Sequence, residues 1–293
     1  MNESCDLSVV IVSYNTKQLL LVCLKSVFLS HITGMTFEVL VYDNRSSDGS
    51  ASEVKREFPR ATVIRGDQNI GYARANNIAI KKSHGRYILL LNSDTEVQTQ
   101  TIQLMYDFME ENPQVAVSTC KLVLEDGRLD PACHRGFPYP WTALTYLVGL
   151  ERLFPKSRLF GRYHLGYFNL EEDHEIDSPS GAFYLVRRDI LFEAGLLDEQ
   201  FFMYGEDLDL SYRIKQKGHL IMYHPRVIAL HRKKRSGRFH ADPIRKLETN
   251  IYFHQNNLLF FKKHLAAKSG VLLTKLVELC YWIRLLLLRS LKI

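Results

Sequence analysis

The sequence predicts an α/β protein built on a mixed, mostly parallel sheet flanked by helices, with amphipathic helices at its C-terminal end. Three observations lead to this fold class. Over the first 120 residues, short β-branched and aliphatic runs alternate with helical patterns, as in repeated βαβ units. A second block of strand and helix patterns follows an irregular stretch. The tail beyond residue 242 then has helical periodicity.

The expected elements of the first half follow one another in a regular order. Short apolar runs predict buried strands, and a pattern with the period of a helix follows most of them. The strands are expected at 7–12, 37–42, 61–65, 87–91 and 115–119, and the helices at 17–29, 51–58, 72–82 and 99–111. Pro113 closes the last of these helices, because proline cannot continue one.

The second half is less regular. Residues 121–177 are rich in Pro, Tyr, Phe and Arg, and a stretch of this length in a compact protein is usually functional. Beyond it we expect a strand at 182–187, helices at 188–194 and 206–217, short strands at 220–223 and 227–230, and a helical tail in two pieces that meet near Ser269 and Gly270. The chain therefore divides into residues 1–120, 121–242 and 243–293.

Composition narrows the functional classes. The chain has 293 residues, 46% of them hydrophobic, and 38 Lys and Arg against 32 Asp and Glu give a net charge of +6. This excludes a disordered or collagen-like protein and favours anionic partners such as nucleic acid, anionic lipid or phosphorylated compounds. The five cysteines form no C-x-x-C pair and the first residues form no basic segment. We therefore expect a cytoplasmic protein without disulfides, a zinc site, a signal peptide or a spanning helix.

Short polar side chains follow the ends of four expected strands. They are Ser13, Tyr14 and Asn15 after the first, Asp43, Asn44 and Ser46 after the second, Gly71 after the third, and Asn92, Ser93 and Asp94 after the fourth. Because ligands bind at the carboxyl ends of strands in such sheets, we expect these residues to face a nucleotide. Neither G-x-G-x-x-G after a strand nor G-x-x-x-x-G-K-[ST] occurs, so dinucleotide and P-loop sites are unsupported.

Acidic residues carry much of the expected chemistry. Asp43 can accept a hydrogen bond from a nucleotide base, and Asp94 can ligate Mg²⁺ or Mn²⁺. Glu206 and Asp207 open an expected helix, where one of them can act as a general base. Helix capping is the alternative role for each of these acids.

A histidine beside a basic run is the remaining candidate. His231 follows an apolar strand pattern and precedes a run that contains Arg232 and Arg235. A solvated loop is the alternative reading of such a run. The neighbouring histidine favours recognition of phosphate or of a metal ion.

Five motifs in this order resemble the inverting family 2 glycosyltransferases, which have a GT-A-type Rossmann-like fold and act on nucleotide-sugars. The motifs are VVIVSYN from Val9, VYDNRSSDGS from Val41, NIGYARANN from Asn69, LLLNSD from Leu89 and FFMYGEDLDLSYR from Phe201. The resemblance covers residues 7–235. It is greatest to the bacterial rhamnosyltransferases that build O-antigen and related cell-envelope polysaccharides, also through SPSGAFYLVRRDIL from Ser178.

The resemblance implies a donor site with Asp43 on the pyrimidine base. The implied donor residues are Ser13, Tyr14, Asn15, Asp43, Asn44, Ser46, Gly71, Arg74, Asn76, Asn92 and Ser93. Within this set, Arg74 and Asn76 would lie near the ribose or the diphosphate. Arg232 and Arg235 would bind the diphosphate.

The resemblance also implies a metal site and a base. Asp94 would be the metal ligand of the family's D-x-D motif, whose first position is Asn92 here, and Asp94 with His231 would hold Mg²⁺ or Mn²⁺. Asp207, next to Glu206, would deprotonate the acceptor hydroxyl. The acceptor pocket would be bordered by Ser180, Gly181 and Ala182.

These implications together describe an enzyme of cell-envelope polysaccharide synthesis. It would move L-rhamnose from dTDP-rhamnose, or a sugar from a related dTDP- or UDP-sugar, to a hydroxyl of a polyprenyl-diphosphate-linked glycan. Residues 1–120 would form the nucleotide-sugar-binding half and residues 121–242 the acceptor-binding and catalytic half. Residues 243–293 would form a helical, membrane-associating region.

The apolar tail and the long loop suggest where this enzyme works. From His264 to Lys292, basic residues gather on about a third of the helix circumference and leucines on most of the rest, as in a helix on an anionic membrane surface. Packing on the protein or on a second subunit is the alternative. The segment 137–160 has the same aromatic, leucine and arginine character. We expect a peripheral protein on the cytoplasmic face of the bacterial inner membrane.

Two other functions are less consistent with the sequence than a glycosyltransferase. A nucleotidyltransferase on a similar sheet would need a Gly-rich basic loop after the first strand, and Ser13 to Lys17 does not form one. A non-catalytic protein that binds nucleic acid or anionic membrane would leave Asp43, Asp94 and Asp207 unexplained. We therefore expect no nucleic-acid partner.

Overall fold

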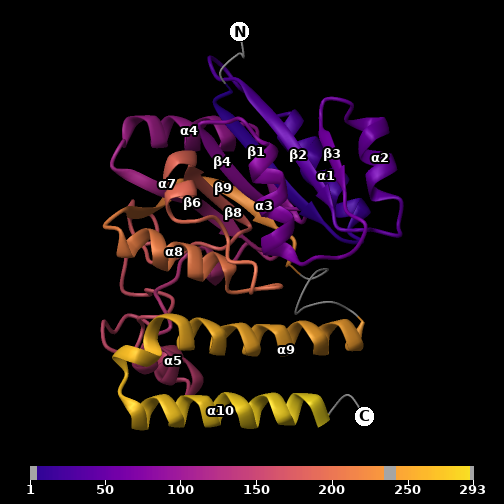
Figure 1. Ribbon diagram of the computed structural model, residues 1–293. Helices are drawn as coiled ribbons and strands as arrows, with labels where there is room; N and C mark the ends of the chain where they lie inside the picture. Colours follow the sequence, from indigo (N-terminus) through magenta and orange to yellow (C-terminus); the bar gives the residue numbers. More distant parts are fainter. Residues whose placement is uncertain (1–4, 234–241, 291–293) are drawn as a thin grey trace.

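A computed structural model of the chain describes residues 5–233 and 242–290. Within these residues a nine-stranded sheet flanked by helices forms the centre of the molecule (Figure 1). The strands are β1 (Leu7–Ser13), β2 (Phe37–Asp43), β3 (Thr62–Arg65), β4 (Tyr87–Asn92), β5 (Thr95–Val97), β6 (Val115–Val123), β7 (His174–Glu175), β8 (Phe183–Arg187) and β9 (Leu220–His231). The helices of this part are α1 (Lys17–Phe28), α2 (Ser50–Glu57), α3 (Tyr72–Lys82), α4 (Thr101–Glu111), α5 (Pro140–Leu147), α6 (Leu150–Leu153), α7 (Arg188–Glu193) and α8 (Glu206–Gln216). The predicted α/β class is confirmed.

The first half of the sheet is parallel. Its strands lie in the order β3-β2-β1-β4, and each neighbouring pair is parallel, because helical crossovers join them. Every residue of β1 is buried, which explains its continuous apolar run. The register sets Ser13 opposite Asp43 and Val12 opposite Asn92. Three of the polar strand ends therefore meet at one edge of the sheet.

Antiparallel pairs enter in the second half. Strand β8 lies between β4 and β6 and is antiparallel to both, while β9 is parallel to β6 and antiparallel to β5 and β7. The two short strands predicted at 220–223 and 227–230 are one strand, whose pairing with β6 is irregular between Cys120 and Lys121. Pro225 lies at this irregularity, since a bulge tolerates a residue that cannot donate to the ladder.

The first two predicted parts of the chain share this sheet. The boundary after residue 120 falls inside β6, which pairs with both β8 and β9. The irregular stretch also contains ordered elements, namely the 3₁₀ turn η1 (Pro131–Cys133), α5, α6 and β7. Residues 1–120 and 121–242 are thus two halves of one structural unit.

The C-terminal helices lie below the sheet, side by side (Figure 1). Helix α9 (Pro243–Phe260) continues through a π-helical turn, η4 (Phe261–Leu265), and a 3₁₀ turn, η5 (Ala266–Lys268), before α10 (Val271–Ser290) begins. Gly270, at φ +73°, permits the reversal between them, as predicted. No helix in the described ranges combines the length and the apolar character needed to cross a membrane.

A small apolar cluster joins the C-terminal helices to the sheet-bearing part. Its buried members are Phe137, Phe201, Leu208, Tyr212, Phe260, Phe261 and Leu265. They come from the long loop, from α8 and the segment before it, and from the end of α9 with η4. The first part of the predicted membrane-associating region therefore packs on the protein itself.

Candidate active site

Hydroxyl groups tie the ends of β1 and β4 together. The Oγ of Ser13 lies 3.0 Å from the Oγ1 of Thr16, which lies 2.9 Å from the Oγ of Ser93. Both predicted serines are buried. This chain of hydroxyls fixes the relative position of two predicted parts of the donor site.

Asp43 has a carboxylate oxygen available for a ligand. The side chain is 1% exposed, and its Oδ2 accepts a hydrogen bond of 3.2 Å from the backbone N–H of Ser46. Its Oδ1 is buried and has no hydrogen-bond partner among the described residues. Buried polar atoms are nearly always paired, so the orphaned oxygen suits an N–H donor of a nucleotide base.

The loops that follow β1 and β2 lock each other. Asn15, at φ +54°, donates its backbone N–H to the Oγ of Ser46 at 2.9 Å, and its Oδ1 accepts from the N–H of Ser47 at 2.8 Å. Asp48 accepts from the N–H of Lys17 at 2.9 Å. Tyr14, by contrast, is 43% exposed and lies at the surface of the site.

Asn44 and Gly71 hold the third strand end in place. Asn44 is buried, accepts from the N–H of Ile70 at 2.9 Å and donates to the carbonyl of Gly71 at 3.2 Å. Gly71 has φ +84°, and a Cβ there would lie 2.5 Å from the carbonyl oxygen of Phe202. Only glycine allows this close approach between the start of α3 and the segment before α8.

The two predicted residues of α3 differ in accessibility. The side chain of Arg74 is 57% exposed, with its Nε 3.7 Å from a carboxylate oxygen of Glu199. Asn76 is fully buried, and its Nδ2 donates to the carbonyl of Tyr72 at 3.0 Å. Asn76 therefore lies beneath the site and braces the helix, whereas Arg74 lies at the surface.

Charged side chains form a series of ion pairs at the predicted metal position. The Nε2 of His231 lies 3.3 Å from the Oδ1 of Asp94, and its Nδ1 lies 2.6 Å from the Oδ2 of Asp130. Lys233 reaches the other oxygen of Asp130 at 2.9 Å. Burial alone would lower the pKa of His231, but the hydrogen bonds to Asp130 and Asp94 raise it to about 9.

The chemistry of these side chains fits part of a site for a divalent ion. Asp130 bonds to the Nδ1 of His231, and the Nε2 faces Asp94. A carboxylate outside the ligand shell commonly orients a metal-binding imidazole in this way. No group of three or more potential ligands exists among residues 5–233 and 242–290. One carboxylate and one imidazole fit an ion that takes its other ligands from a diphosphate and water.

The two predicted diphosphate residues contribute little to this picture. Arg232 pairs with Glu96 at 2.8 Å and with Glu125 at 3.2 Å, so its charge is already partly neutralised by protein. Arg235 lies outside the described residues.

Glu206 and Asp207 occupy the first turn of α8, after Gly205 at φ +87°. Glu206 is 6% exposed, and its Oε2 has no hydrogen-bond partner in the described part of the chain. Burial, together with the neighbouring Asp207 carboxylate, raises the pKa of Glu206 to about 8. Glu206 is therefore protonated at neutral pH and cannot serve as a base there.

Asp207 is held by the irregular stretch 121–177 and by the predicted acceptor segment. Its Oδ2 accepts a hydrogen bond of 2.8 Å from Arg135 and one of 3.3 Å from the N–H of Gly181. The Nη2 of Arg135 also donates to the carbonyl of Pro179 at 3.0 Å. This network fixes the carboxylate beside the segment Ser180 to Ala182.

The predicted acceptor segment lies beside the end of β4, which leads to the predicted metal position. The N–H of Asn92 reaches the carbonyl of Ala182 at 3.4 Å, so Ser180 to Ala182 face the chain that leads to Asp94. Tyr72 donates from its hydroxyl to the carbonyl of Gly181 at 3.2 Å. Burial and then the charges of Glu206, Asp207 and Asp94 raise the pKa of Tyr72. The buried hydroxyl of Tyr72 thus binds the backbone of the predicted acceptor segment.

Three residues of the site were not predicted from the sequence. Asp130 and Arg135 come from the irregular stretch after residue 120, where no periodicity indicates which side chains point inward. Tyr72 lies inside the motif NIGYARANN, but nothing in the local sequence distinguishes it from a core tyrosine. For Asp130 and Arg135 the only available signal was charge within a segment otherwise rich in aromatic residues.

A family model matches most of the sheet-bearing part of the chain. The model of the family described as "Glycosyl transferase family 2" matches residues 8–191. That segment contains the strand ends and the acceptor segment, and it ends before α8.

Two curated proteins of related sequence are named as sugar transferases. The N-acetylglucosaminyl-diphospho-decaprenol L-rhamnosyltransferase of Mycobacterium tuberculosis is 26% identical over 232 residues, which cover 71% of this chain and 70% of the relative. The low-salt glycan biosynthesis hexosyltransferase Agl10 of Haloferax volcanii is 27% identical over 218 residues, which cover 72% of this chain and 62% of Agl10.

Solved structures share the fold. The mannosyltransferase PcManGT of Pyrobaculum calidifontis, in complex with GDP-Man and Mn²⁺, superposes with a TM-score of 0.60 at 17% identity, over 92% of this chain and 66% of its own. S. aureus TarS 1-349 in complex with UDP gives a TM-score of 0.55 at 17% identity, over 87% of this chain and 65% of its own. The chain spans about two thirds of each of these structures.

Proposed function

Because the chain belongs to glycosyl transferase family 2, we propose that it is an inverting hexosyltransferase that moves a sugar from a nucleoside diphosphate to a hydroxyl of a lipid-linked glycan. One observation carries the proposal. Asp94 and Asp207 come from distant parts of the chain, yet both lie beside the segment Ser180 to Ala182. The N–H of Gly181 donates to Asp207 at 3.3 Å, and the N–H of Asn92, two residues before Asp94, donates to the carbonyl of Ala182 at 3.4 Å. In an inverting transfer, a base must lie on the side of the attacking hydroxyl, and positive charge must lie on the side of the leaving diphosphate.

On the donor side, the orphaned Oδ1 of Asp43 is the proposed acceptor for the N–H of a pyrimidine base. Tyr14 and Arg74 are exposed at the rim and are proposed to contact the nucleoside and the ribose or diphosphate. Asp94 and His231 would hold Mg²⁺ or Mn²⁺. When bound, the ion supplies positive charge that neutralises the departing diphosphate.

On the acceptor side, Asp207 is the proposed base. As the acceptor oxygen attacks the anomeric carbon, its proton passes to the Asp207 carboxylate, and the bond from that carbon to the diphosphate oxygen breaks on the opposite face. The configuration at the anomeric carbon is inverted. Arg135 and the N–H of Gly181 orient the carboxylate, and the protonated Glu206 adds no second negative charge beside it.

The donor and acceptor are proposed from the related sequences. A relative of 26% identity is named for transfer of L-rhamnose to N-acetylglucosaminyl-diphospho-decaprenol. We therefore favour dTDP-rhamnose as donor and a polyprenyl-diphosphate-linked glycan of the cell envelope as acceptor. Transfer from a UDP-sugar is the nearest alternative, because uracil and thymine present the same ring N–H to an acceptor such as Asp43.

A peripheral position on the cytoplasmic face of the inner membrane suits such an acceptor. Exposed apolar residues concentrate on α10 and on α5 with the turn after it, including Leu272 at 86% and Leu147 at 71%. Tyr163 packs on α5, where its ring centroid lies 5.0 Å from that of Tyr146. Burial and the neighbouring Tyr163 also raise the pKa of Tyr281 to about 12.

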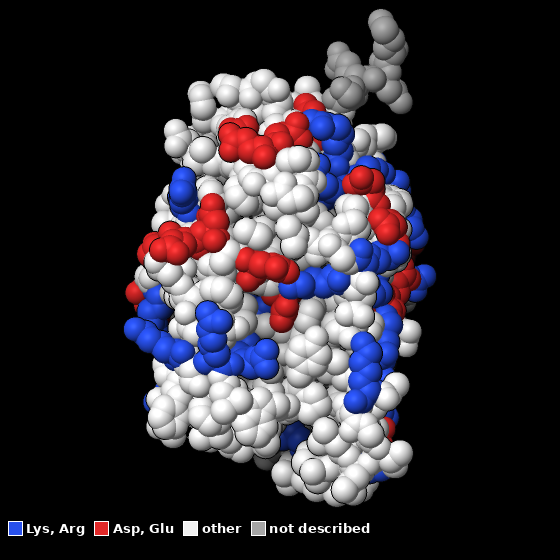
Figure 2. Space-filling view, turned by 90° about the vertical axis from the view of Figure 1, so that its left-hand side faces the viewer, with Lys and Arg blue, Asp and Glu red and all other residues white. Residues whose placement is uncertain are grey.

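The charge distribution supports an anionic lipid surface as the partner of this region. The lower end of the molecule in Figure 2 is largely uncharged, whereas Lys, Arg, Asp and Glu crowd the part above it. The charged residues of α10 are Lys275, Glu278, Arg284 and Arg289, three of them cationic. An apolar surface interspersed with cations binds anionic lipid through both contributions.

A thermal-shift panel tests the donor proposal. The protein would be melted with dTDP-rhamnose, UDP-galactose, UDP-N-acetylglucosamine and GDP-mannose, each with and without Mn²⁺. We expect the pyrimidine donors to raise the melting temperature, dTDP-rhamnose most of all, and Mn²⁺ to increase the shift. Selective stabilisation by GDP-mannose would overturn the proposed donor class.

A further inference from the structure

The acid pair of α8 is held from both sides by the C-terminal helices. The segment Phe201 to Gly205 leads into Glu206 and Asp207, and Asp209 follows them within the same turn. Residues of α9 and η4 contact the chain before the pair and after it. This part of the tail therefore does more than present an apolar surface.

Before the pair, α9 holds the approach to the helix. Asn256 is buried, and its Nδ2 donates to the carbonyl of Met203 at 2.8 Å. The rings of Phe202 and Tyr252 lie 5.0 Å apart. On its other side, the carbonyl of Phe202 accepts a hydrogen bond of 2.7 Å from the N–H of Tyr72. The approach segment is thus clamped between α9 and the donor-side helix α3.

After the pair, Asp209 is the anchor. It is completely buried, and its Oδ1 contacts the Nζ of Lys263 at 2.6 Å and the Nε2 of His264 at 2.7 Å. Its Oδ2 pairs with Arg213 at 2.7 Å. Burial alone would raise the pKa of Asp209, but these three partners lower it to about 2.

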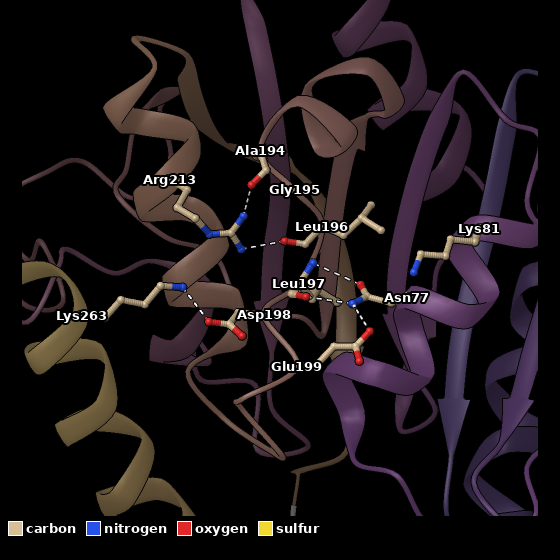
Figure 3. A pocket seen from close by; sticks show the side chains of 10 residues that line it. All are labelled: Asn77, Lys81, Ala194, Gly195, Leu196, Leu197, Asp198, Glu199, Arg213 and Lys263. Atoms are coloured by element: carbon tan, nitrogen blue, oxygen red, sulfur yellow. Dashed lines mark hydrogen bonds and ion pairs between the residues drawn. The ribbon is translucent and has the colours of Figure 1, made fainter.

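The π-helical turn explains how two consecutive residues reach one oxygen. Lys263 and His264 both lie in η4, where the wider turn changes the direction of successive side chains. Lys263 also pairs with Asp198 at 2.7 Å, and Arg213 donates to the carbonyl of Leu196 at 2.7 Å (Figure 3). These groups border a cavity of about 430 Å³. These side chains bond to one another, so they connect η4, α8 and the turn after α7.

We propose that α9 and η4 are a positioning element for the acid pair, in which Asn256 fixes the segment before Glu206 and Lys263 with His264 fixes the turn after Asp207. The orientation of Asp207 toward the acceptor then depends on residues that are distant in sequence and touch no substrate. The inference rests on the proposed function of Asp207. Lys263 is the best point of attack, because it joins Asp209 to Asp198.

The test uses Lys263→Met in the full chain, with Lys262→Met as its matched control. Lys262 lies in the same turn, is 52% exposed and contacts only Glu278 of α10, at 3.5 Å, among its described ion-pair partners. We expect Lys263→Met to increase amide hydrogen exchange in residues 201–209 about tenfold or more, with exchange in β1 and β4 unchanged. Lys262→Met should leave both regions unchanged. Unaltered exchange at 201–209, or an equal increase throughout the sheet, would overturn the proposal.

Kinetics separate positioning from general stability. Lys263→Met should lower kcat about tenfold and leave the donor KM within twofold, and Lys263→Arg should restore most of kcat because it keeps the charge. Equal loss of kcat in Lys262→Met would count against the inference. If the wild-type protein transfers no sugar, the proposed function fails, while hydrogen exchange still decides whether η4 holds the acid pair.

Discussion

Replacement of Glu206 by glutamine should remove a specific pH dependence of stability. Glu206 has an ordinary pKa of 4.5 that burial, followed by the Asp207 charge, raises to about 8 in the folded protein. A raised folded pKa contributes stability that is complete below pH 4.5 and is lost as the pH rises toward 8. The loss amounts to about 1.4 kcal/mol per pH unit, on the order of 4 kcal/mol in total. Glutamine keeps the shape and cannot ionise, so Glu206→Gln should lack this loss.

Urea unfolding at pH 5, 6, 7 and 8.5 measures the effect. The free energy of unfolding of the wild type, less that of Glu206→Gln, should fall steadily from pH 5 to 8 and then level off. Other titrating groups cancel in this difference because both proteins contain them. A difference that does not vary with pH would refute the protonated Glu206 on which the assignment of Asp207 as base depends.

Two further predictions concern the metal position and the membrane surface. Asp130→Asn should weaken Mn²⁺ binding in the presence of dTDP by about 10-fold to 100-fold, because the hydrogen bond that orients His231 becomes weaker. Calorimetry would measure the affinity, with Asp126→Asn in the same loop as the control. An unchanged affinity in Asp130→Asn would contradict the proposed metal site. Leu272→Asp should reduce sedimentation with phosphatidylglycerol vesicles about tenfold. The exposed apolar side chain is replaced by a carboxylate, which has the same negative charge as the lipid. Leu29→Asp, at an exposed leucine directly after α1, should have no effect, and equal losses in both variants would argue against α10 as the docking surface.

Local sequence information was sufficient for the part of the site built on parallel strands. The apolar runs of β1, β2 and β4 end at Ser13, Asp43 and Asn92, and parallel pairing brings these ends together whatever the loops do. The same reasoning gave the first turn of α8, where Gly205 and two acids mark a helix start. These features follow from short segments of sequence.

The partners of these residues were beyond local reasoning. Asp130 and Arg135 depend on how an irregular segment folds back over the sheet, and neither strand nor helix periodicity describes such a path. The junction of Asp209 with Lys263 and His264 joins residues more than 50 positions apart through a π-helical turn. Residues 243–293 were assigned as a whole to a membrane-associating region, although α9 packs against the segment before α8.

The central claim is that Asp207 is the base of a sugar transfer, and Asp207→Asn tests it most directly. Release of nucleoside diphosphate and labelling of a polyprenyl-diphosphate N-acetylglucosamine acceptor would be followed with dTDP-rhamnose, and nucleotide affinity would be measured in parallel. Asp107→Asn, which changes a carboxylate on α4 bonded to Gln103, is the control. We predict that transfer by Asp207→Asn falls at least about 100-fold, the usual contribution of a general base, while nucleotide affinity changes less than threefold. Transfer by that variant at the wild-type rate would contradict the account.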